Sequence, residues 1–188
     1  MKRMILASGS PRRKELLQML EVPFEVLVSD TKEVITKNEP AEVTKELSYQ
    51  KAMAVAGQVE EGIIIGADTV VSIDGKILGK PADTEEAREM IYKLQGKSHM
   101  VYTGVTVIAK SGDMVSASLF AEGTKVNVAP MTENEIEAYI STDEPYDKAG
   151  AYGIQGLFGK FIEGIKGDYF NVVGLPIHRL YEELKKFD

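Results

Sequence analysis

The sequence predicts an α/β fold in which helices flank a mixed β-sheet. Apolar runs of strand length alternate with segments of helical periodicity. An Asp-Gly pair between two apolar runs indicates a tight hairpin turn, and two helix starts carry capping residues. The 188 residues suffice for one sizeable domain and show neither repeats nor an interdomain linker. We therefore expect a single domain over residues 1–188.

The first half of the chain should alternate short buried strands with amphipathic helices. Strands are assigned to apolar runs, and helices to apolar residues spaced three or four apart. In chain order the expected elements are a strand at 4–7, a helix at 14–20, a strand at 23–28, a helix at 41–56 and a strand at 62–71. The turn at Asp74-Gly75 should then fold the next strand back on the last of these.

The second half should contain more extended structure. Asp83 with Glu86, and Thr132 with Glu135, have the spacing of helix-capping boxes. The remaining expected elements are β segments at 99–109 and 115–129, a Gly- and Ala-rich loop at 143–156, a hairpin at 161–173 and a last helix introduced by Pro176.

Composition excludes several classes of protein. The chain has 22 Lys and Arg against 29 Asp and Glu, a net charge of −7, which disfavours nucleic-acid and anionic-membrane partners. It has no cysteine, which excludes disulfides, thiolate metal sites and a cysteine nucleophile. His99 and His178 lack metal or triad spacing. The apolar run near Met1 is too short for a signal peptide and no run is long enough to span a membrane, so we expect a soluble cytoplasmic protein.

A small-residue loop near the N-terminus is a candidate anion site. Ser8 lies in this loop, and Arg12 and Arg13 follow at the expected start of a helix. Cations are unfavourable at a helix N-terminus unless an anion compensates them. Backbone N–H groups, hydroxyls and two guanidinium groups together suit a polyphosphate. The alternative is a solvated basic helix start.

Asp68 is the leading catalytic candidate because we expect it to end the most apolar strand, where a carboxylate needs a metal, cation or donor to compensate its desolvation. The alternative is a turn cap assisted by Thr69. Lys80 should return toward Asp68 after the hairpin, and Pro81 restrains the backbone before it. By itself, Lys80 would be interpreted as an exposed loop lysine.

Three further residues have open interpretations. Lys51 leans toward the apolar side of its helix, where it either snorkels to the surface or reaches a buried anion. Glu33 is a metal carboxylate or part of a charged loop. In the Gly-rich loop, Gln155 could read uracil or thymine and, with its amide rotated, cytosine. The loop could equally be a packed structural element.

Taken together, these segments resemble the Maf family of nucleoside triphosphate pyrophosphatases. They occur in the expected order over nearly the whole chain, and they are specific only jointly. The matching pieces are Ser8–Arg13, Glu33, Lys51, Gly66–Thr69, Gly79–Pro81, Glu144–Pro145, Asp147–Gly156, Gly167–Tyr169 and Val173–Pro176.

The resemblance implies the family's fold: an elongated mixed sheet flanked by helices, with a cleft between two lobes, similar to inosine triphosphatases. It also implies the dTTP/UTP branch, because its base-choice positions correspond to Arg12, Thr69 and Gln155. Lys125 departs from the family, whose members often carry an acidic residue there; we expect it to adjust the rim of the site without altering the chemistry.

The implied reaction converts a nucleoside triphosphate and water to the monophosphate and pyrophosphate. Mg²⁺, for which Mn²⁺ or Co²⁺ could substitute, would be held by Glu33 and Asp68, and Asp68 would also orient and deprotonate water. The residues expected to bind the substrate are Ser8, Arg12, Arg13, Lys51, Thr69, Lys80 and Gln155.

A second class of function is a cell-division regulator that binds a nucleotide without turning it over, as the family's association with septum formation suggests. The residues themselves give no support for a protein partner. The sequence is compatible with a homodimer and leaves the oligomeric state open.

Overall fold

The computed structural model describes residues 3–28, 30 and 32–187, and the chain divides into two compact units. Unit 1 comprises Met1–Asp68, Thr103–Glu122 and Gly174–Asp188, and unit 2 comprises Thr69–Tyr102 and Gly123–Val173.

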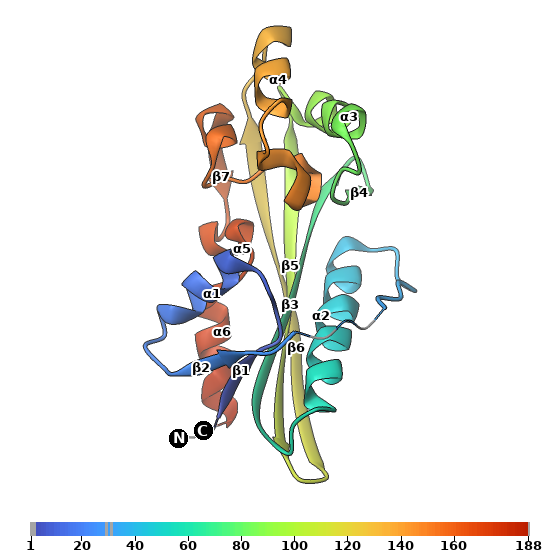
Figure 1. Cartoon of the computed structure of the whole chain (residues 1–188). Coiled ribbons are helices and arrows are strands. Elements are labelled where there is room, and N and C mark those ends of the chain that lie inside the picture. The colour runs from blue at the N-terminus through green and yellow to red at the C-terminus, as the bar shows by residue number, and fades with distance from the viewer. Residues whose placement is uncertain (1–2, 29, 31, 188) are drawn as a thin grey trace. The chain divides into compact units, whose positions relative to one another are not determined.

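The expected mixed sheet is present. Over the described residues, seven strands form one sheet in the order β2-β1-β3-β5-β6-β7, with β4 paired to β3 (Figure 1). β1 is parallel to both β2 and β3, whereas β4 is antiparallel to β3 and β7 to β6. The strands are β1 (Met4–Leu6), β2 (Phe24–Val26), β3 (Glu61–Ile73), β4 (Lys76–Leu78), β5 (Ser98–Ser111), β6 (Met114–Val128) and β7 (Ile162–Lys166).

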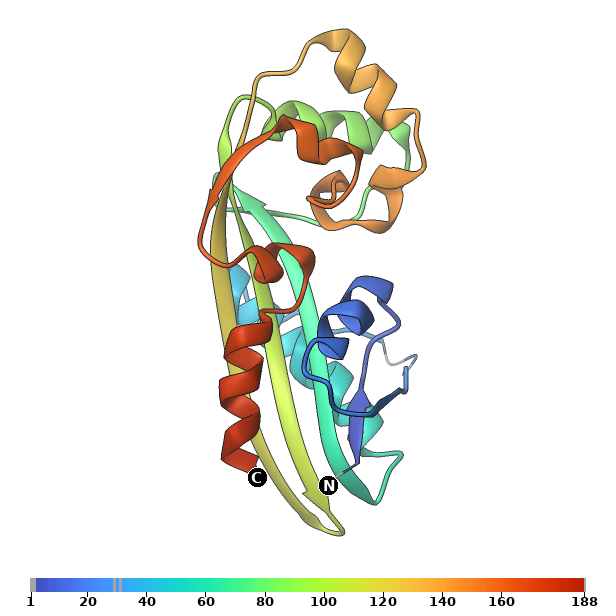
Figure 2. The same ribbon diagram turned by 90° about the vertical axis from the view of Figure 1, so that its left-hand side faces the viewer.

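In unit 1, helices cover both faces of the sheet. α2 (Pro40–Ala56) and α6 (Ile177–Leu184) lie on opposite sides of the long strands in both ribbon views (Figures 1 and 2). α1 (Pro11–Gln18) begins three residues earlier than the sequence predicts. Pro11 explains the difference, because a proline in the first turn has the backbone angle that a helix needs and no N–H to satisfy.

Two glycines let α2 lie directly on the sheet. A Cβ atom on Gly66 of β3 would come 2.4 Å from the carbonyl oxygen of Ser48 in α2, and one on Gly104 of β5 would come 2.2 Å from the carbonyl carbon of Thr44. Behind this contact, Ser48 and Thr106 share a buried hydrogen bond of 2.9 Å. Side chains larger than hydrogen at these two positions would force the helix away from the strands.

Unit 2 has its own apolar core and a helix pair. α3 (Thr84–Leu94) and α4 (Glu133–Ile140) are joined by an ion pair between Arg88 Nε and Glu137 Oε1 at 2.6 Å. The core includes Ile91, Val126 and Phe158, all buried. Other helical segments are η1 (Glu144–Asp147), η2 (Ala149–Ala151), η3 (Leu157–Phe161) and α5 (Tyr169–Val173), and η4 (Lys185–Phe187) follows α6 in unit 1.

The predicted caps are largely confirmed. Thr132 and Glu135 form a complete capping box at the start of α4. At α3 the Asp83 carboxylate accepts from the Glu86 N–H at 2.9 Å, as expected. The reciprocal bond is shifted by one residue, because the Glu86 carboxylate accepts from the N–H of Ala82.

The hairpin predicted at 161–173 is wrong. Only β7 is extended, and it pairs with β6. Gly167, with φ of 131°, breaks the strand, and the Asp168 carboxylate then accepts from the N–H of Phe170 at 2.8 Å. This local cap starts α5, where a returning strand was expected.

The hairpin at Asp74-Gly75 is confirmed. Both residues have positive φ, 51° and 74°, as a two-residue type I′ turn requires. β4 runs back along β3 with Ile73 opposite Lys76 and Val71 opposite Leu78. The chain direction after the turn is therefore the one that the sequence indicates.

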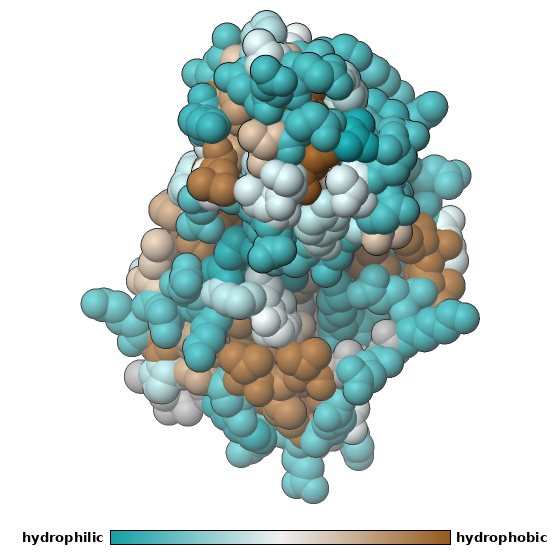
Figure 3. All heavy atoms as spheres, turned by 45° about the horizontal axis from the view of Figure 1, so that its top comes forward, coloured by the Kyte–Doolittle hydropathy of each residue, from teal (hydrophilic) through white to brown (hydrophobic). Residues whose placement is uncertain are grey.

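The surface view shows mainly hydrophilic side chains, with apolar ones in separate patches (Figure 3). Across the described residues, no helix is both long and apolar enough to cross a membrane.

Candidate active site

Asp68 lies inside a strand, which corrects the prediction that it ends one. β3 continues to Ile73. What ends here is the neighbouring parallel strand: β1 pairs with β3 only as far as Leu6 opposite Ile65, and the N–H of Ala7 then donates to the carbonyl of Ile65 at 2.8 Å. Asp68 is therefore just beyond the carboxyl end of β1, the kind of edge at which sites form in α/β folds.

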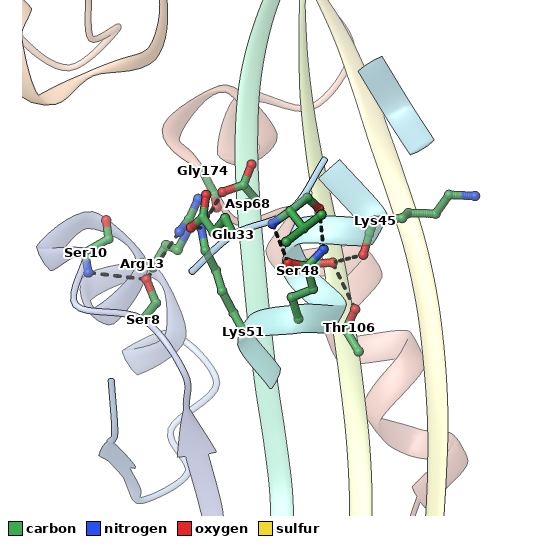
Figure 4. A network of polar contacts seen from close by, with 12 residues as sticks. Ser8, Ser10, Arg13, Glu33, Lys45, Ser48, Lys51, Asp68, Thr106 and Gly174 are labelled. Atoms are coloured by element: carbon green, nitrogen blue, oxygen red, sulfur yellow. Dashed lines mark hydrogen bonds and ion pairs between the residues drawn. The ribbon is translucent and has the colours of Figure 1, made fainter. Parts of the chain in front are cut away.

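Lys51 contacts two carboxylates. Its ammonium nitrogen forms a hydrogen bond with Asp68 Oδ1 and lies 3.1 Å from Glu33 Oε1 (Figure 4). The side chain of Asp68 is 13% exposed, and that of Lys51 26%. Of the two interpretations of Lys51, the structure supports the one in which it reaches an anion. An ammonium so placed offsets the repulsion between the carboxylates and the cost of desolvating Asp68.

Helix α2 also holds the segment that carries Glu33. The Gln50 side chain accepts from the N–H of Val34 at 2.9 Å and donates to its carbonyl at 2.6 Å. One turn earlier, the Glu46 carboxylate accepts from the N–H of Thr36 at 2.9 Å. These bonds fix the backbone immediately after Glu33, so one helix supplies the lysine and positions its second carboxylate partner.

The N-terminal loop and α1 contribute an oriented guanidinium group. Arg13 donates from Nε to the carbonyl of Gly174 at 2.9 Å and from Nη1 to Ser8 Oγ at 3.2 Å. The same hydroxyl accepts from the N–H of Ser10 at 3.3 Å. Gly174 has φ of 128°, a backbone conformation that favours glycine, and so presents its carbonyl to Arg13. Arg12 precedes Arg13 in the first turn of α1 and is half-buried.

The pKa of Arg13 reflects both its burial and the charged side chains around it. Burial lowers the pKa of Arg13, the Asp68 carboxylate opposes that shift, and the positive charge of Arg12 reinforces it. Glu33 acts in the same direction as Asp68. In Figure 4 the side chains of Arg13 from α1, Glu33 from the segment before α2, Lys51 from α2 and Asp68 from β3 point toward one another.

The two carboxylates fit a divalent cation. Because the Lys51 ammonium contacts Glu33 and Asp68 together, an oxygen of each lies beside the same positive charge. Magnesium bound with phosphates needs only one or two protein carboxylates, water and phosphate oxygens supplying the rest. Within the described ranges, no cluster of three or more His, Cys, Asp or Glu side chains could hold a metal. Two carboxylates of this kind suit a metal whose other ligands are water and phosphate oxygens.

The remaining predicted site residues belong to unit 2. Thr69 follows Asp68 in β3 and is half-buried. Lys80 is exposed, two residues beyond the end of β4. The β3–β4 register, continued past its last pair, leads back toward Thr69. The carbonyl of Gly79, next to Lys80, accepts from the N–H of Gly150 at 2.9 Å, which ties this segment to the Gly-rich loop.

Gln155 is exposed at a turn of the Gly-rich loop, in which the N–H of Gly156 donates to the carbonyl of Gly153 at 3.2 Å. Tyr152, just before the turn, is buried, and its hydroxyl lies 2.6 Å from His99 Nε2. Burial lowers the pKa of His99 to about 4, so the ring is neutral at pH 7. His99 is thus structural, as the sequence indicates.

Several residues that hold the predicted site residues in place are not themselves predicted from the sequence. Gln50 and Glu46 carry a weak signal, since they share one helix face with an i, i+4 spacing. Gly174 and Glu144 appear in the matching motifs, but nothing in their local sequence predicts contacts to Arg13 or to the loop of Gln155.

Comparison with known proteins identifies the family. The family model described as Maf-like protein matches residues 3–187. A dTTP/UTP pyrophosphatase of Bacillus cytotoxicus is 54% identical over 189 residues, covering 100% of this chain and 97% of that protein. One of Bacillus cereus is 50% identical with the same coverage. Among solved structures, the Staphylococcus aureus Ham1 protein shares the fold, with a TM-score of 0.56 at 13% identity and coverage of 100% of both chains. The resemblance predicted from the motifs is confirmed: this chain belongs to the Maf-like protein family.

Proposed function

We propose that this protein hydrolyses nucleoside triphosphates to monophosphates and pyrophosphate, and that it prefers dTTP and UTP. The main support for this proposal is that the Lys51 ammonium contacts both Glu33 and Asp68. The Arg13 guanidinium points toward the same two carboxylates (Figure 4). Cations and carboxylates together suit a ligand that is a metal–polyphosphate complex. The names of the full-length relatives support this substrate class.

The cations would bind the triphosphate. Arg13 is pre-oriented by Gly174 and Ser8, so it has little conformational freedom to lose when a phosphate binds. Ser8 would add a hydrogen bond, and Arg12 and Lys51 further positive charge. We assign Lys80 of unit 2 to the phosphates as well, on the resemblance alone.

Asp68 is the proposed catalytic residue. Its mostly buried carboxylate would orient a water molecule and accept its proton, while Glu33 and Asp68 would hold Mg²⁺, or Mn²⁺ or Co²⁺ in its place. When bound, such a metal polarises the α-phosphate and stabilises the departing pyrophosphate. The chain contains no cysteine, and we propose direct attack by water without a covalent intermediate.

Base choice is assigned to Gln155, with Thr69 and Arg12. The Gln155 side chain is exposed and carries both an acceptor for N3–H and a donor for O4, the edge that uracil and thymine share. The physiological role would be to remove unwanted or modified pyrimidine triphosphates.

A nucleotide panel with Mg²⁺ tests the proposal. We expect release of pyrophosphate, and not orthophosphate, with dTTP and UTP ahead of CTP and GTP in kcat/KM. Preferential turnover of purines would contradict the branch assignment. Saturable nucleotide binding with no pyrophosphate released would instead support the cell-division regulator without turnover.

A further inference from the structure

We propose that Glu144 is a positioning residue for base recognition: its carboxylate fixes the turn that presents Gln155. This inference rests on the proposed role of Gln155. All of the contacts that carry it lie within unit 2.

The turn needs external support because its tip is exposed. Gln155 and Gly156 are exposed, and the turn's own closing bond is the 3.2 Å contact between the Gly156 N–H and the Gly153 carbonyl. Productive recognition by a single amide requires that its direction be fixed before the base arrives. The support must therefore come from the residues on either side of the turn.

On the N-terminal side the anchor is a buried tyrosine pair. The Tyr152 hydroxyl contacts His99, and the Tyr139 hydroxyl donates to the carbonyl of Ala151 at 3.0 Å. The rings of Tyr152 and Phe158 also pack against each other in a tilted arrangement, with 4.8 Å between their centroids. After these contacts, Gly153 and Ile154 are half-buried and Gln155 is exposed, and the chain is buried again at Phe158.

On the C-terminal side the anchor is Glu144. Its Oε2 accepts from the N–H of Leu157 at 2.7 Å, and its Oε1 accepts from the N–H of Phe158 at 3.3 Å and from the Tyr139 hydroxyl at 3.2 Å. Its carboxylate also touches the turn itself, because a Cβ atom on Gly156 would lie 2.4 Å from both oxygens. Tyr139 thus connects the two anchors.

The chemistry of this anchor calls for a carboxylate. Two of the groups that face Glu144 are backbone N–H donors, and the third is the phenolic O–H of Tyr139, whose single proton is shared with the carbonyl of Ala151. A carboxylate offers acceptors only, whereas an amide of the same shape would turn an NH₂ group toward one of these donors. Glu144→Gln therefore weakens the hydrogen bonds that hold the residues just after Gln155, while the volume of the side chain stays nearly the same.

The test compares Glu144→Gln with Glu163→Gln, which makes the same charge change at an exposed position in β7 of the same unit. For Glu144→Gln we expect kcat/KM for dTTP and UTP to fall about tenfold, mainly because KM rises. The preference over CTP, defined as the ratio of kcat/KM for dTTP or UTP to kcat/KM for CTP, should become smaller. The Kd for inorganic triphosphate, which has no base, should be unchanged. Glu163→Gln should match the wild type in all three measurements.

A double-mutant cycle separates this inference from the proposed function. If Glu144 acts through Gln155, then Glu144→Gln should narrow the preference over CTP much less in a Gln155→Ala background. If Gln155→Ala alone leaves the preference unchanged, the proposed base reading fails. If Gln155→Ala abolishes the preference while Glu144→Gln leaves it intact, only the present inference fails.

A purely structural role for Glu144 would give a different result. Glu144→Gln would then weaken the binding of inorganic triphosphate and of every nucleotide to the same extent, and it would lower the melting temperature. That result would overturn the inference. Should Glu144→Gln not fold, Tyr139→Phe removes the donor to Glu144 and to the Ala151 carbonyl while keeping the ring. It should narrow the preference over CTP in the same direction, and an unchanged preference would count against the inference.

Discussion

At the scale of single residues, the charges around Asp68 explain how a carboxylate is tolerated in an apolar strand. Ile64, Ile65 and Ala67 before it are completely buried, yet Asp68 has an ammonium partner in Lys51. Such a pairing offsets the desolvation cost of the carboxylate. A carboxylate in this position can bind a metal or accept a proton from water.

Replacing Asp68 by asparagine should separate binding from chemistry. The substitution keeps the shape of the side chain but removes its charge and basicity, so turnover of UTP should fall by roughly 10² or more. UTP binding, measured by titration calorimetry, should largely survive because the cations remain. Asp113→Asn, at the exposed turn between β5 and β6, is the matched control. Turnover close to that of the wild type would refute the assignment of Asp68.

Replacing Gln155 by glutamate should change base choice. The new carboxylate removes the donor to O4 and places negative charge against that oxygen, and an unpaired polar group discriminates far more strongly than a methyl group does. The loss in kcat/KM should be much larger for dTTP and UTP than for CTP and GTP. If all four substrates keep their wild-type ranking, Gln155 does not read the base.

Most of the candidate residues could be found from sequence, but their contacts could not. Lys51 is a candidate on sequence alone because a cation on the apolar side of a helix must either extend to solvent or contact an anion. The position of Glu33 depends on bonds to Gln50 and Glu46 that cross a loop, and no local rule predicts such bonds. For the same reason, Glu144 could be seen only as part of a motif.

At the scale of elements, periodicity and capping predicted the helices well, and the errors arose where short-range chemistry overrode an apolar pattern. The segment 161–173 looks like two strands because it is apolar. Asp168 nevertheless caps a helix at once after Gly167 ends β7. The sequence predicts that Asp68 ends its strand, whereas the strand that ends here is its neighbour β1. Strand pairing depends on residues that are far apart in the sequence, so it cannot be predicted from the sequence of one strand.

The close approach of α2 to the sheet gives a prediction at this scale. Gly66→Ala would place a methyl group 2.4 Å from the Ser48 carbonyl oxygen and 2.9 Å from Ala52 Cβ, so the helix must shift. Overpacking of this kind should lower the free energy of unfolding by about 1–3 kcal/mol. Because the shift moves Lys51 as well, turnover should also fall.

Gly57→Ala serves as the control for that substitution. Gly57 follows the same helix with φ of −66°, and its added methyl group would meet its nearest atom at an ordinary 3.6 Å. Urea unfolding of both variants and their UTP turnover are the measurements. Equal stability and activity of the two variants would show that the contact at Gly66 does not position α2.

At the scale of the whole molecule, the fold class follows from the alternation of strand and helix patterns, and the family follows from the order of the motifs along the chain. The division into two compact units does not, because each unit combines segments distant in sequence, such as 1–68 with 103–122. A single domain over the full length stays a prediction, as does a cleft. The metal-binding candidates and most of the phosphate-binding candidates belong to unit 1, whereas Thr69, Lys80, Gln155 and the residues that support Gln155 belong to unit 2.

Hydrolysis of UTP in ¹⁸O-labelled water tests the central claim most directly, because it reports both the bond broken and the atom attacked. Asp68 is proposed to direct water at the α-phosphorus. Mass spectrometry of a single turnover should therefore find one ¹⁸O in UMP and none in pyrophosphate. Label in pyrophosphate, or products that are UDP and orthophosphate, would contradict the account.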